Sequence, residues 1–163
     1  MNLKNEILEI LENDAKVTNE EIAGMLHIEV AQVAQIIEKL EEDKTIVKYV
    51  AVINKENLDE EVSAEALIEV KVTPERDLGY NEIARRIYKF QEVKAVYLMS
   101  GRYDLSVRVR STSMKKISQF VWEKLAVLKG VRGTSTTFIM RKYKENGVIL
   151  VQDEDDKRLM VTP

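Results

Sequence analysis

The chain of 163 residues has no cysteine and a single histidine, His27. Without cysteine it can form no disulfide, no thiolate nucleophile and no cysteine metal site. One histidine also argues against a multi-histidine metal centre and against most acid–base schemes that depend on imidazole. The sequence contains neither a glycine-rich phosphate loop nor a metal-binding spacing. It therefore predicts a protein that is not an enzyme and that has no catalytic residues, cofactor or metal.

Long apolar runs are scarce as well. No stretch approaches the roughly 18 consecutive apolar residues of a membrane-spanning helix. The first ten residues, MNLKNEILEI, mix charged side chains with leucine and isoleucine, unlike a secretory signal. Apolar residues make up 45% of the chain and charged residues 33%, which is typical of a folded globular protein. We therefore expect a soluble cytoplasmic protein without a membrane partner.

Charge is distributed unevenly along the chain. Residues 1–48 contain five Lys/Arg against eleven Asp/Glu, a net charge of −6, whereas residues 61–147 contain seventeen against ten, a net charge of +7. The stretches 49–60 and 148–163 each carry −2. We therefore expect an acidic N-terminal domain over 1–48, a linker over 49–60, a basic C-terminal domain over 61–147 and an acidic tail over 148–163.

Three short helical patterns follow one another in the N-terminal domain. The first covers about residues 3–12, and the third covers about residues 29–43. The second begins at Thr18, where the letters TNEE predict a capping box between Thr18 and Glu21. A short helix, a tight turn and a second amphipathic helix together predict a helix-turn-helix. A three-helix bundle without a nucleic-acid partner fits the same pattern.

The third helix has two unlike faces. Val33, Ile37 and Leu40 share one face, which can pack on the other two helices. The opposite face is polar and more acidic than basic. After it, residues 45–53 (TIVKYVAVI) alternate and are rich in β-branched side chains, which predicts a flanking strand that runs into the linker.

The C-terminal domain shows six elements in the order β-α-β-β-α-β. In order, they are expected at about residues 64–72, 81–90, 93–99, 103–109, 114–128 and 134–143, with Ser113 capping the second helix. This order predicts a ferredoxin-like fold with a four-stranded antiparallel sheet and both helices on one face. The whole chain is then of the α+β class. The uncovered face of the sheet is half polar, which favours packing against a second copy of the chain.

Three stretches of the sequence resemble a known family. They are ILEILENDAKVTNEEIAGML, VAQIIEKLEEDKTIVKYVAVIN and VKAVYLMSGRYDLSVRV, and the resemblance covers about residues 2–144. Together they resemble the Lrp/AsnC family of feast/famine transcriptional regulators, and within it a Firmicute-type branch. The last stretch is the most specific, because the family typically places a small residue, glycine, two variable residues and aspartate between its central strands.

The resemblance implies double-stranded DNA as a partner and control of amino-acid metabolism genes. It implies homodimers whose sheets pair face to face, with further assembly into higher oligomers such as octamers. It also implies a small amino acid-like effector near the Gly-x-x-Asp hairpin. The candidate effector residues are Gly101 for its backbone groups, Asp104 for the ligand's ammonium, and Arg102, Tyr103, Ser135 and Thr136 as further contacts. In the alternative interpretation, Asp104 only bonds a nearby backbone amide and the two hydroxyl residues follow ordinary strand propensity.

The recognition helix departs from the family in ways that bear on DNA binding. His27 stands where the family often has glycine, and we expect it to adopt a left-handed turn conformation. Glu29 stands where the family usually has serine, and it is a poor helix cap. The candidate DNA-binding residues are Gln32 and Gln35 for adenine edges, and Lys39 and Lys44 for phosphates. The alternative is that these four residues only form a solvated helix face.

Few lysines and arginines on this helix mean little counterion release, which is the main source of DNA affinity. We therefore expect a sequence-specific regulator that binds DNA through several weak contacts on one oligomer. The alternative is an effector-sensing oligomer whose DNA binding is weak or absent and which acts through a protein partner.

Overall fold

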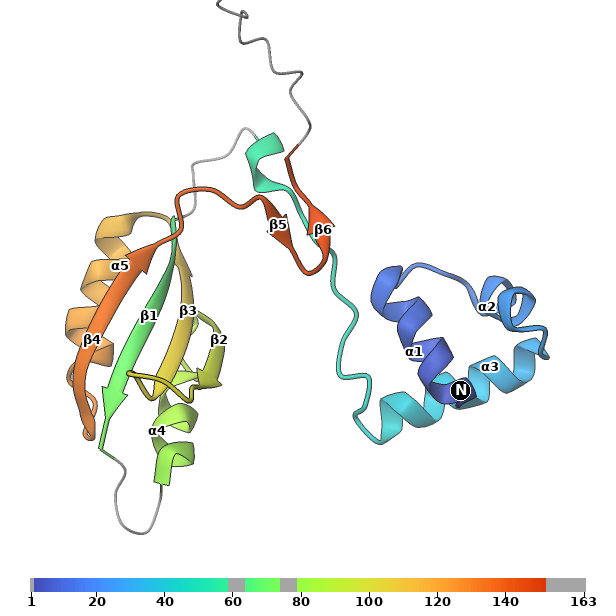
Figure 1. Cartoon of the computed structure of the whole chain (residues 1–163), viewed down its shortest axis with the longest axis horizontal. Coiled ribbons are helices and arrows are strands. Elements are labelled where there is room, and N and C mark those ends of the chain that lie inside the picture. The colour runs from blue at the N-terminus through green and yellow to red at the C-terminus, as the bar shows by residue number, and fades with distance from the viewer. Residues whose placement is uncertain (1, 59–63, 74–78, 152–163) are drawn as a thin grey trace, which may run out of the picture. The chain divides into compact units, whose positions relative to one another are not determined.

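The computed structural model describes residues 2–58, 64–73 and 79–151 of the chain. The chain divides into two compact units, Met1–Ile53 and Asn54–Pro163. The first unit is helical and the second contains a sheet with its helices (Figure 1). Among the described residues, no helix is long and apolar enough to cross a membrane.

The N-terminal unit consists of three helices, as the sequence predicted. They are α1 (Leu3–Asn13), α2 (Asn19–Leu26) and α3 (Val30–Glu42). Ile7 of α1, Ile22 and Ala23 of α2, and Val33 of α3 form a buried core between them. Burial of these side chains holds α3 against α1 and α2, because each large apolar side chain removed from water contributes roughly 1.5–3 kcal/mol. This packing fixes which face of α3 remains in solvent.

The two ends of α2 confirm two local predictions. At its start, the Thr18 hydroxyl accepts a hydrogen bond from Glu21 N at 3.2 Å, and the Glu21 carboxylate accepts one from Thr18 N at 2.8 Å. This is the predicted capping box. At its end, His27 has φ +55° and ψ +45°, the expected left-handed conformation. The poor cap predicted for α3 is also confirmed, because the Glu29 side chain makes no capping hydrogen bond.

The flanking strand predicted over residues 45–53 was wrong. These residues form neither a strand nor a helix. A β-branched, alternating sequence favours extended backbone, but a strand also needs a neighbour to accept and donate its ladder hydrogen bonds. Within the described part of this single chain, residues 45–53 pair with no strand.

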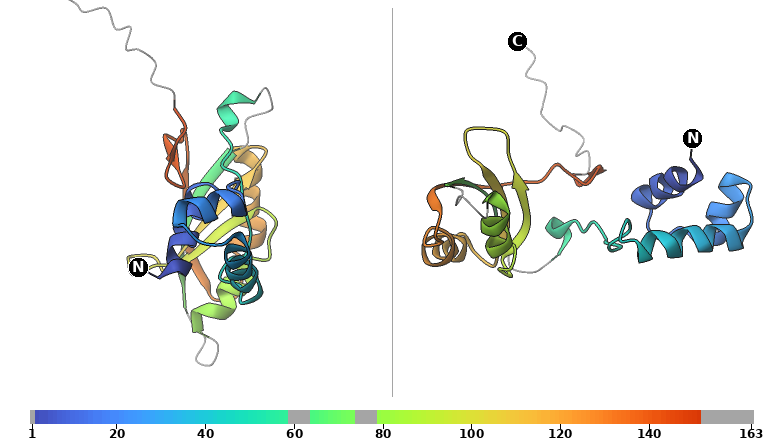
Figure 2. Two further views of the ribbon diagram at one scale, coloured as in Figure 1. Left: turned by 90° about the vertical axis from the view of Figure 1, so that its right-hand side faces the viewer. Right: turned by 90° about the horizontal axis from the view of Figure 1, so that it is seen from below.

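The C-terminal unit has the predicted β-α-β-β-α-β order. Its elements are β1 (Ala64–Val72), α4 (Gly79–Ile87), β2 (Val93–Leu98), β3 (Leu105–Ser111), α5 (Met114–Phe120), which continues into the π-helical turn η2 (Val121–Leu125), and β4 (Val131–Phe138). The strands form an antiparallel sheet in the order β2-β3-β1-β4, and Figure 2 shows both helices on one face of it. Two further elements precede and follow the sheet: a short 3-10 helix, η1 (Lys55–Asn57), and a hairpin of β5 (Lys144–Glu145) and β6 (Val148–Ile149).

Alternation along β1 and β3 separates the two faces of the sheet. Side chains at every second position are buried under the helices: Ala66, Ile68, Val70 and Val72 on β1, and Leu105, Val107 and Val109 on β3. Ile83 and Ile87 of α4 and Ile117, Phe120 and Leu125 of the α5–η2 helix complete this core. The intervening positions lie on the other face, which we call the open face. It carries charged residues and Leu67, which is 39% exposed.

The second helix differs from the single long helix that was predicted. Ser113 caps its start as expected, since its hydroxyl accepts a hydrogen bond from Lys116 N at 3.3 Å. The regular α5 then ends at Phe120, and the π-helical turn η2 follows. This wider turn keeps Val121 and Leu125 in the core, where both are buried.

The first residues of the predicted acidic tail, from residue 148, belong to a strand. Val148 and Ile149 pair with Glu145 and Lys144 in the β5–β6 hairpin. Two residues with positive φ, Asn146 and Gly147, make the turn. The rest of the predicted tail, residues 152–163, lies outside the described residues.

The left-handed conformation of His27 generates a stability prediction. Replacing His27 with glycine should make the N-terminal unit more stable than replacing it with alanine, by about 1 kcal/mol, because only glycine adopts positive φ without Cβ strain. Both variants remove the imidazole, so their difference isolates the backbone effect. Urea unfolding followed by far-ultraviolet circular dichroism measures it, and equal midpoints for the two variants would contradict the assignment.

Candidate functional site

One side of α3 presents three of the predicted DNA-binding residues together. Gln32, Gln35 and Lys39 are separated by three and four residues, so they lie on one face of the helix, and all three are exposed. The buried Val33 and Leu40 anchor the opposite side. The fold therefore brings two amide side chains and one ammonium group to a single solvent-facing strip.

Lys44 lies apart from that strip. It follows the C-terminal end of α3, has φ +60° and is exposed. Next to it, Asp43 forms an ion pair with Lys4 at 3.3 Å. The Thr45 hydrogen bonds, followed by that of Lys4, hold the pKa of Asp43 below its usual range. A carboxylate that stays ionised here lowers the positive potential around Lys44.

Acidic residues surround the exposed strip of α3. Glu38, Glu41 and Glu42 lie on the same helix and are exposed. Tyr49 donates a hydrogen bond to the Glu41 carboxylate at 2.9 Å, and burial, together with this charge, raises the pKa of the Tyr49 hydroxyl. The strip can hydrogen-bond to base edges through its two glutamines, whereas its capacity to neutralise phosphates is small.

The loop between β2 and β3 contains most of the predicted effector residues, and Asp104 anchors it. The Asp104 carboxylate accepts a hydrogen bond from Val72 N at 2.9 Å and pairs with the Lys71 ammonium at 3.3 Å. Its backbone continues the sheet on both sides, since Asp104 N donates to Val70 O and Met99 N donates to Asp104 O. The Val72 hydrogen bond, followed by that of Lys71, holds the pKa of Asp104 below its usual range.

These contacts match the alternative interpretation of Asp104, in which it binds a nearby backbone amide. These contacts do not saturate the Asp104 carboxylate, because an ionised carboxylate offers about four lone-pair positions. The carboxylate can therefore accept a hydrogen bond from another donor. The side chain of Asp104 is 16% exposed.

The other loop residues offer backbone more than side chains. Gly101 is exposed, has no left-handed φ, and a Cβ added there would meet no atom within 4 Å. The chain's own fold therefore does not require glycine at this position. The guanidinium of Arg102 lies 6.0 Å from the centre of the Tyr103 ring. The backbone carbonyl of Arg102 accepts a hydrogen bond from Lys71 Nζ at 2.9 Å.

Ser135 and Thr136 are not brought to one site. In the β1–β4 ladder Ser135 lies opposite Glu69, and Thr136 lies opposite Ile68. Successive residues of a strand point to opposite faces, so Ser135 belongs to the open face and Thr136 to the helix-covered face. Ser135 shares its face with Lys71, which binds Asp104, and this makes Ser135 the stronger candidate of the two.

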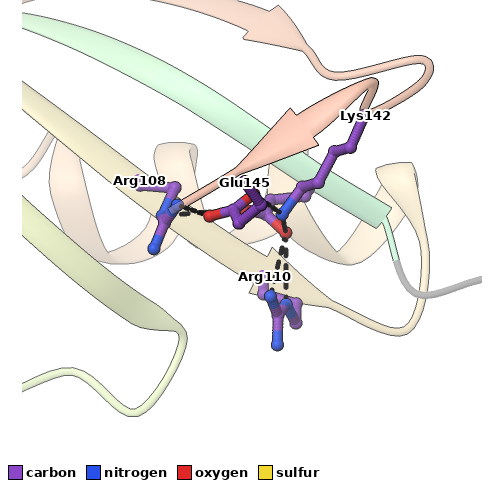
Figure 3. Close-up of polar contacts among 5 residues, drawn as sticks. Arg108, Arg110, Lys142 and Glu145 are labelled. Carbon is purple, nitrogen blue, oxygen red and sulfur yellow. Dashed lines mark hydrogen bonds and ion pairs between the residues drawn. The ribbon is translucent and has the colours of Figure 1, made fainter. Parts of the chain in front are cut away.

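A further group of charges on the open face was not predicted. Figure 3 shows it, and we call it the ion cluster: Glu65, Arg108, Arg110, Lys142 and Glu145. Glu65 is only 7% exposed and accepts hydrogen bonds from Arg110 at 3.1 and 3.2 Å. Strand alternation places Glu65, Arg108 and Arg110 on one face, but Lys142 and Glu145 follow β4 in a stretch without periodicity. No sequence signal could assign those two residues to the cluster.

The described residues include no group of three His, Cys, Asp or Glu side chains that could hold a metal ion. The α3 strip and the β2–β3 loop are instead suited to hydrogen bonding and charge pairing.

Comparisons with known proteins agree with both units. A model of winged helix-turn-helix DNA-binding domains matches residues 2–47, and a model of the Lrp/AsnC ligand-binding domain matches residues 65–149. The chain is 48% identical over 158 residues to the uncharacterized HTH-type transcriptional regulator YugG of Bacillus subtilis, a match that covers 97% of this chain and 95% of that protein. It is 32% identical over 139 residues to the HTH-type transcriptional regulator FL11 of Pyrococcus furiosus, which covers 85% of this chain and 88% of that one.

A solved structure shows the same fold. The transcriptional regulator NMB0573 of Neisseria meningitidis, determined as a complex with L-Met, superposes with a TM-score of 0.72 at 21% identity, covering 89% of this chain and 92% of that one. The two domain matches and the identity to YugG confirm the resemblance given by the sequence motifs, including its narrower branch. With its helix-turn-helix DNA-binding unit and its ligand-binding unit, the chain belongs to the Lrp/AsnC family of transcriptional regulators.

Proposed function

We propose that the chain regulates genes of amino-acid metabolism, binds its DNA sites as a homo-oligomer and responds to a small amino acid-like effector. The observation that carries the proposal is the exposed strip of α3, where Gln32, Gln35 and Lys39 stand together on a helix-turn-helix core. This arrangement suits sequence readout and provides little nonspecific attraction.

Weak single contacts favour an oligomer. Affinity for DNA depends mainly on phosphate neutralisation, and each neutralised phosphate contributes about 0.9 to the slope of log affinity against log salt. Lys39 lies on the strip and Lys44 lies beyond the C-terminal end of α3, so each unit brings few cations to its DNA site. Several helix-turn-helix units on one assembly raise the effective concentration of each for neighbouring sites, so the oligomer binds where a single unit does not.

The open face of the sheet is where a second copy would pack. Both helices cover the other face, and the open face exposes Leu67 near its centre, with Tyr97 on the edge strand β2 54% exposed. A sheet needs cover on any face with exposed apolar side chains, and a second identical face provides it symmetrically.

The β2–β3 loop is the proposed effector site. An amino acid carries an ammonium and a carboxylate, and the loop offers a partner for each: the Asp104 carboxylate, and the open backbone at Gly101. The relative NMB0573 was solved with L-Met, which supports an amino acid as the class of ligand. Arg102 and Tyr103 of the same loop, and Ser135 on the open face, are the side chains we propose as further contacts.

The acidity of the N-terminal unit favours a second candidate function. Its residues 1–48 carry a net charge of −6, which opposes approach to DNA. In this candidate, the oligomer senses its effector and acts through a protein partner. The two functions separate in one measurement, since a chain that retards no genomic fragment at low salt supports the second.

The strip of α3 generates the first functional prediction. Changing Gln32 and Gln35 to alanine should reduce discrimination between cognate and random duplexes by about 1–3 kcal/mol for each bidentate glutamine–base pair removed. Lys39→Gln should instead weaken binding to all sequences alike and lower the salt slope by about 0.9 for each phosphate that is no longer neutralised. Fluorescence titration of the full chain against duplexes from a genomic fragment selection measures both.

The matched control is Gln119→Ala, an exposed glutamine on α5 in the other unit. It should leave affinity and discrimination unchanged. Reduced discrimination in the control, or full discrimination in the double glutamine variant, would count against the strip as the reading surface.

The β2–β3 loop generates the second functional prediction. Because a Cβ at Gly101 would meet nothing in the chain, Gly101→Ala should change the free energy of unfolding by less than about 0.5 kcal/mol. It should nevertheless weaken L-methionine binding, measured by calorimetry, because the methyl group would lie where the ligand approaches the backbone. Gly24→Ala, whose Cβ also meets nothing, is the control in the other unit. Equal L-methionine binding by both variants would overturn the assignment.

Asp104→Asn tests the structural role of the Asp104 carboxylate. The folded-state pKa of Asp104 is lowered, so its carboxylate stabilises the fold above the pKa of the unfolded chain. That stabilisation disappears as the pH falls through the folded pKa. In urea unfolding, Asp104→Asn should therefore be less stable than the original chain at neutral pH, and the difference should shrink toward acid pH. A difference that does not vary with pH would contradict the role of this carboxylate.

A further inference from the structure

The β5–β6 hairpin is held to the sheet mainly by charge. Within Lys144–Ile149, Glu145 is the one residue that is not exposed; Val148 and Ile149 are 48% and 69% exposed. The hairpin has only two paired positions on each strand, and such short hairpins are unstable alone in water. Its position on the open face therefore depends on the ion pairs that Glu145 makes with Arg108 and with Lys142, the latter at 2.9 Å.

The same hairpin holds the residue at which the C-terminal unit begins. The Asn54 side-chain amide donates a hydrogen bond to Leu150 O at 2.6 Å, and Leu150 N donates to Tyr143 O at 2.9 Å. Asn54 directly follows Ile53, the last residue of the N-terminal unit. A continuous series of contacts thus runs from the ion cluster through the hairpin to the point where the chain leaves toward the helix-turn-helix.

Two cations of the cluster are shared between the sheet and the hairpin. Lys142 Nζ lies 2.8 Å from the Glu65 carboxylate and 2.9 Å from that of Glu145. Arg108 pairs with Glu145 through its terminal nitrogen, while its Nε lies 3.6 Å from Glu65 Oε1. That Nε and that Oε1 are buried and have no hydrogen-bond partner within the described part of the chain. Both are strong hydrogen-bonding groups left unsatisfied by the present arrangement.

This sharing makes a second arrangement accessible at low cost. If Glu145 leaves, Arg108 can close onto Glu65 in a two-pronged contact that satisfies both unpaired atoms. Lys142 keeps its contact with Glu65. The removal of the Glu145 ion pairs is thereby partly compensated, which suits the cluster to act as a switch element.

We propose that the ion cluster is a releasable latch that uses Glu145 to hold the β5–β6 hairpin at the open face of the sheet, and that Asn54 is held in turn by its hydrogen bond to Leu150. With the latch closed, the start of the C-terminal unit is fixed at Asn54. With the latch open, the hairpin leaves the sheet and Asn54 moves with it. The segment before Asn54, which leads to the helix-turn-helix unit, is then freer to move. The consequence for regulation rests on the proposed function, whereas the latch itself does not.

Glu145→Gln in the full chain tests the latch. It removes the charge that holds the hairpin but leaves Glu65 and its partners in place. Hydrogen exchange measured by mass spectrometry should become roughly tenfold or more faster for the segment 143–151, because an opening that costs 1.4 kcal/mol less is tenfold more populated. Exchange of the β1–β3 ladder should not change. The control is Glu123→Gln, an exposed acid of the same unit, which should alter neither. Unchanged exchange over 143–151 in Glu145→Gln would overturn the latch.

A second variant tests the connection to Asn54. Because the chain has no cysteine, Glu12→Cys provides a single labelling site on α1 for fluorescence anisotropy decay. Both Glu145→Gln and Asn54→Ala should increase the independent motion of the labelled unit, but only Glu145→Gln should speed exchange over 143–151. A loosened hairpin with unchanged motion of the label would overturn the proposed tether. Neither measurement uses DNA, so a failure of the proposed function would be seen separately, as absence of DNA binding.

Discussion

Alternation of apolar and charged residues along β1 and β3 is the constraint on which the C-terminal unit depends. Ile68, Val70, Val107 and Val109 are fully buried under the helices, and this burial fixes the register of the two central strands. The same register turns Glu65, Arg108 and Arg110 to the other side. A slip by one residue would exchange the two faces and bury the charges. The register of β1 and β3 therefore determines both the ion cluster and the open face.

In the function we propose, the two units have different parts in recognition, in keeping with their different charge. The helix-turn-helix unit provides a small strip with hydrogen-bonding side chains and an excess of acid, so it suits selectivity better than affinity. In the proposed assembly, the sheet unit holds several copies together and so supplies the affinity that the strip lacks, because linked weak contacts bind far more tightly than single ones. The Asp104 loop and the ion cluster lie at the two ends of the β1–β3 pair, so the proposed effector site and the proposed latch belong to the same two strands.

Local signals in the sequence predicted local structure well. Thr18, His27 and Ser113 behave as expected because caps and left-handed turns depend on residues three or four positions apart. The order of strands and helices followed from alternation and helical spacing. Long-range effects could not be predicted: residues 45–53 lack a strand partner within the described chain, and Glu145 reaches the sheet from beyond β4. The sequence motifs did not separate Ser135 from Thr136, whereas the strand register assigns them to opposite faces of the sheet.

The proposal that DNA affinity comes from assembly through the open face is tested most directly with Leu67→Glu. Val127→Glu is the control, since Val127 is more exposed than Leu67, at 68%, and lies between η2 and β4, outside the sheet strands. Sedimentation and fluorescence titration should be run on short duplexes with one site and long duplexes with several. We expect Leu67→Glu to be monomeric and to lose only the extra affinity for long duplexes, while Val127→Glu resembles the original chain. A monomeric Leu67→Glu that binds long duplexes undiminished would contradict assembly as the source of affinity.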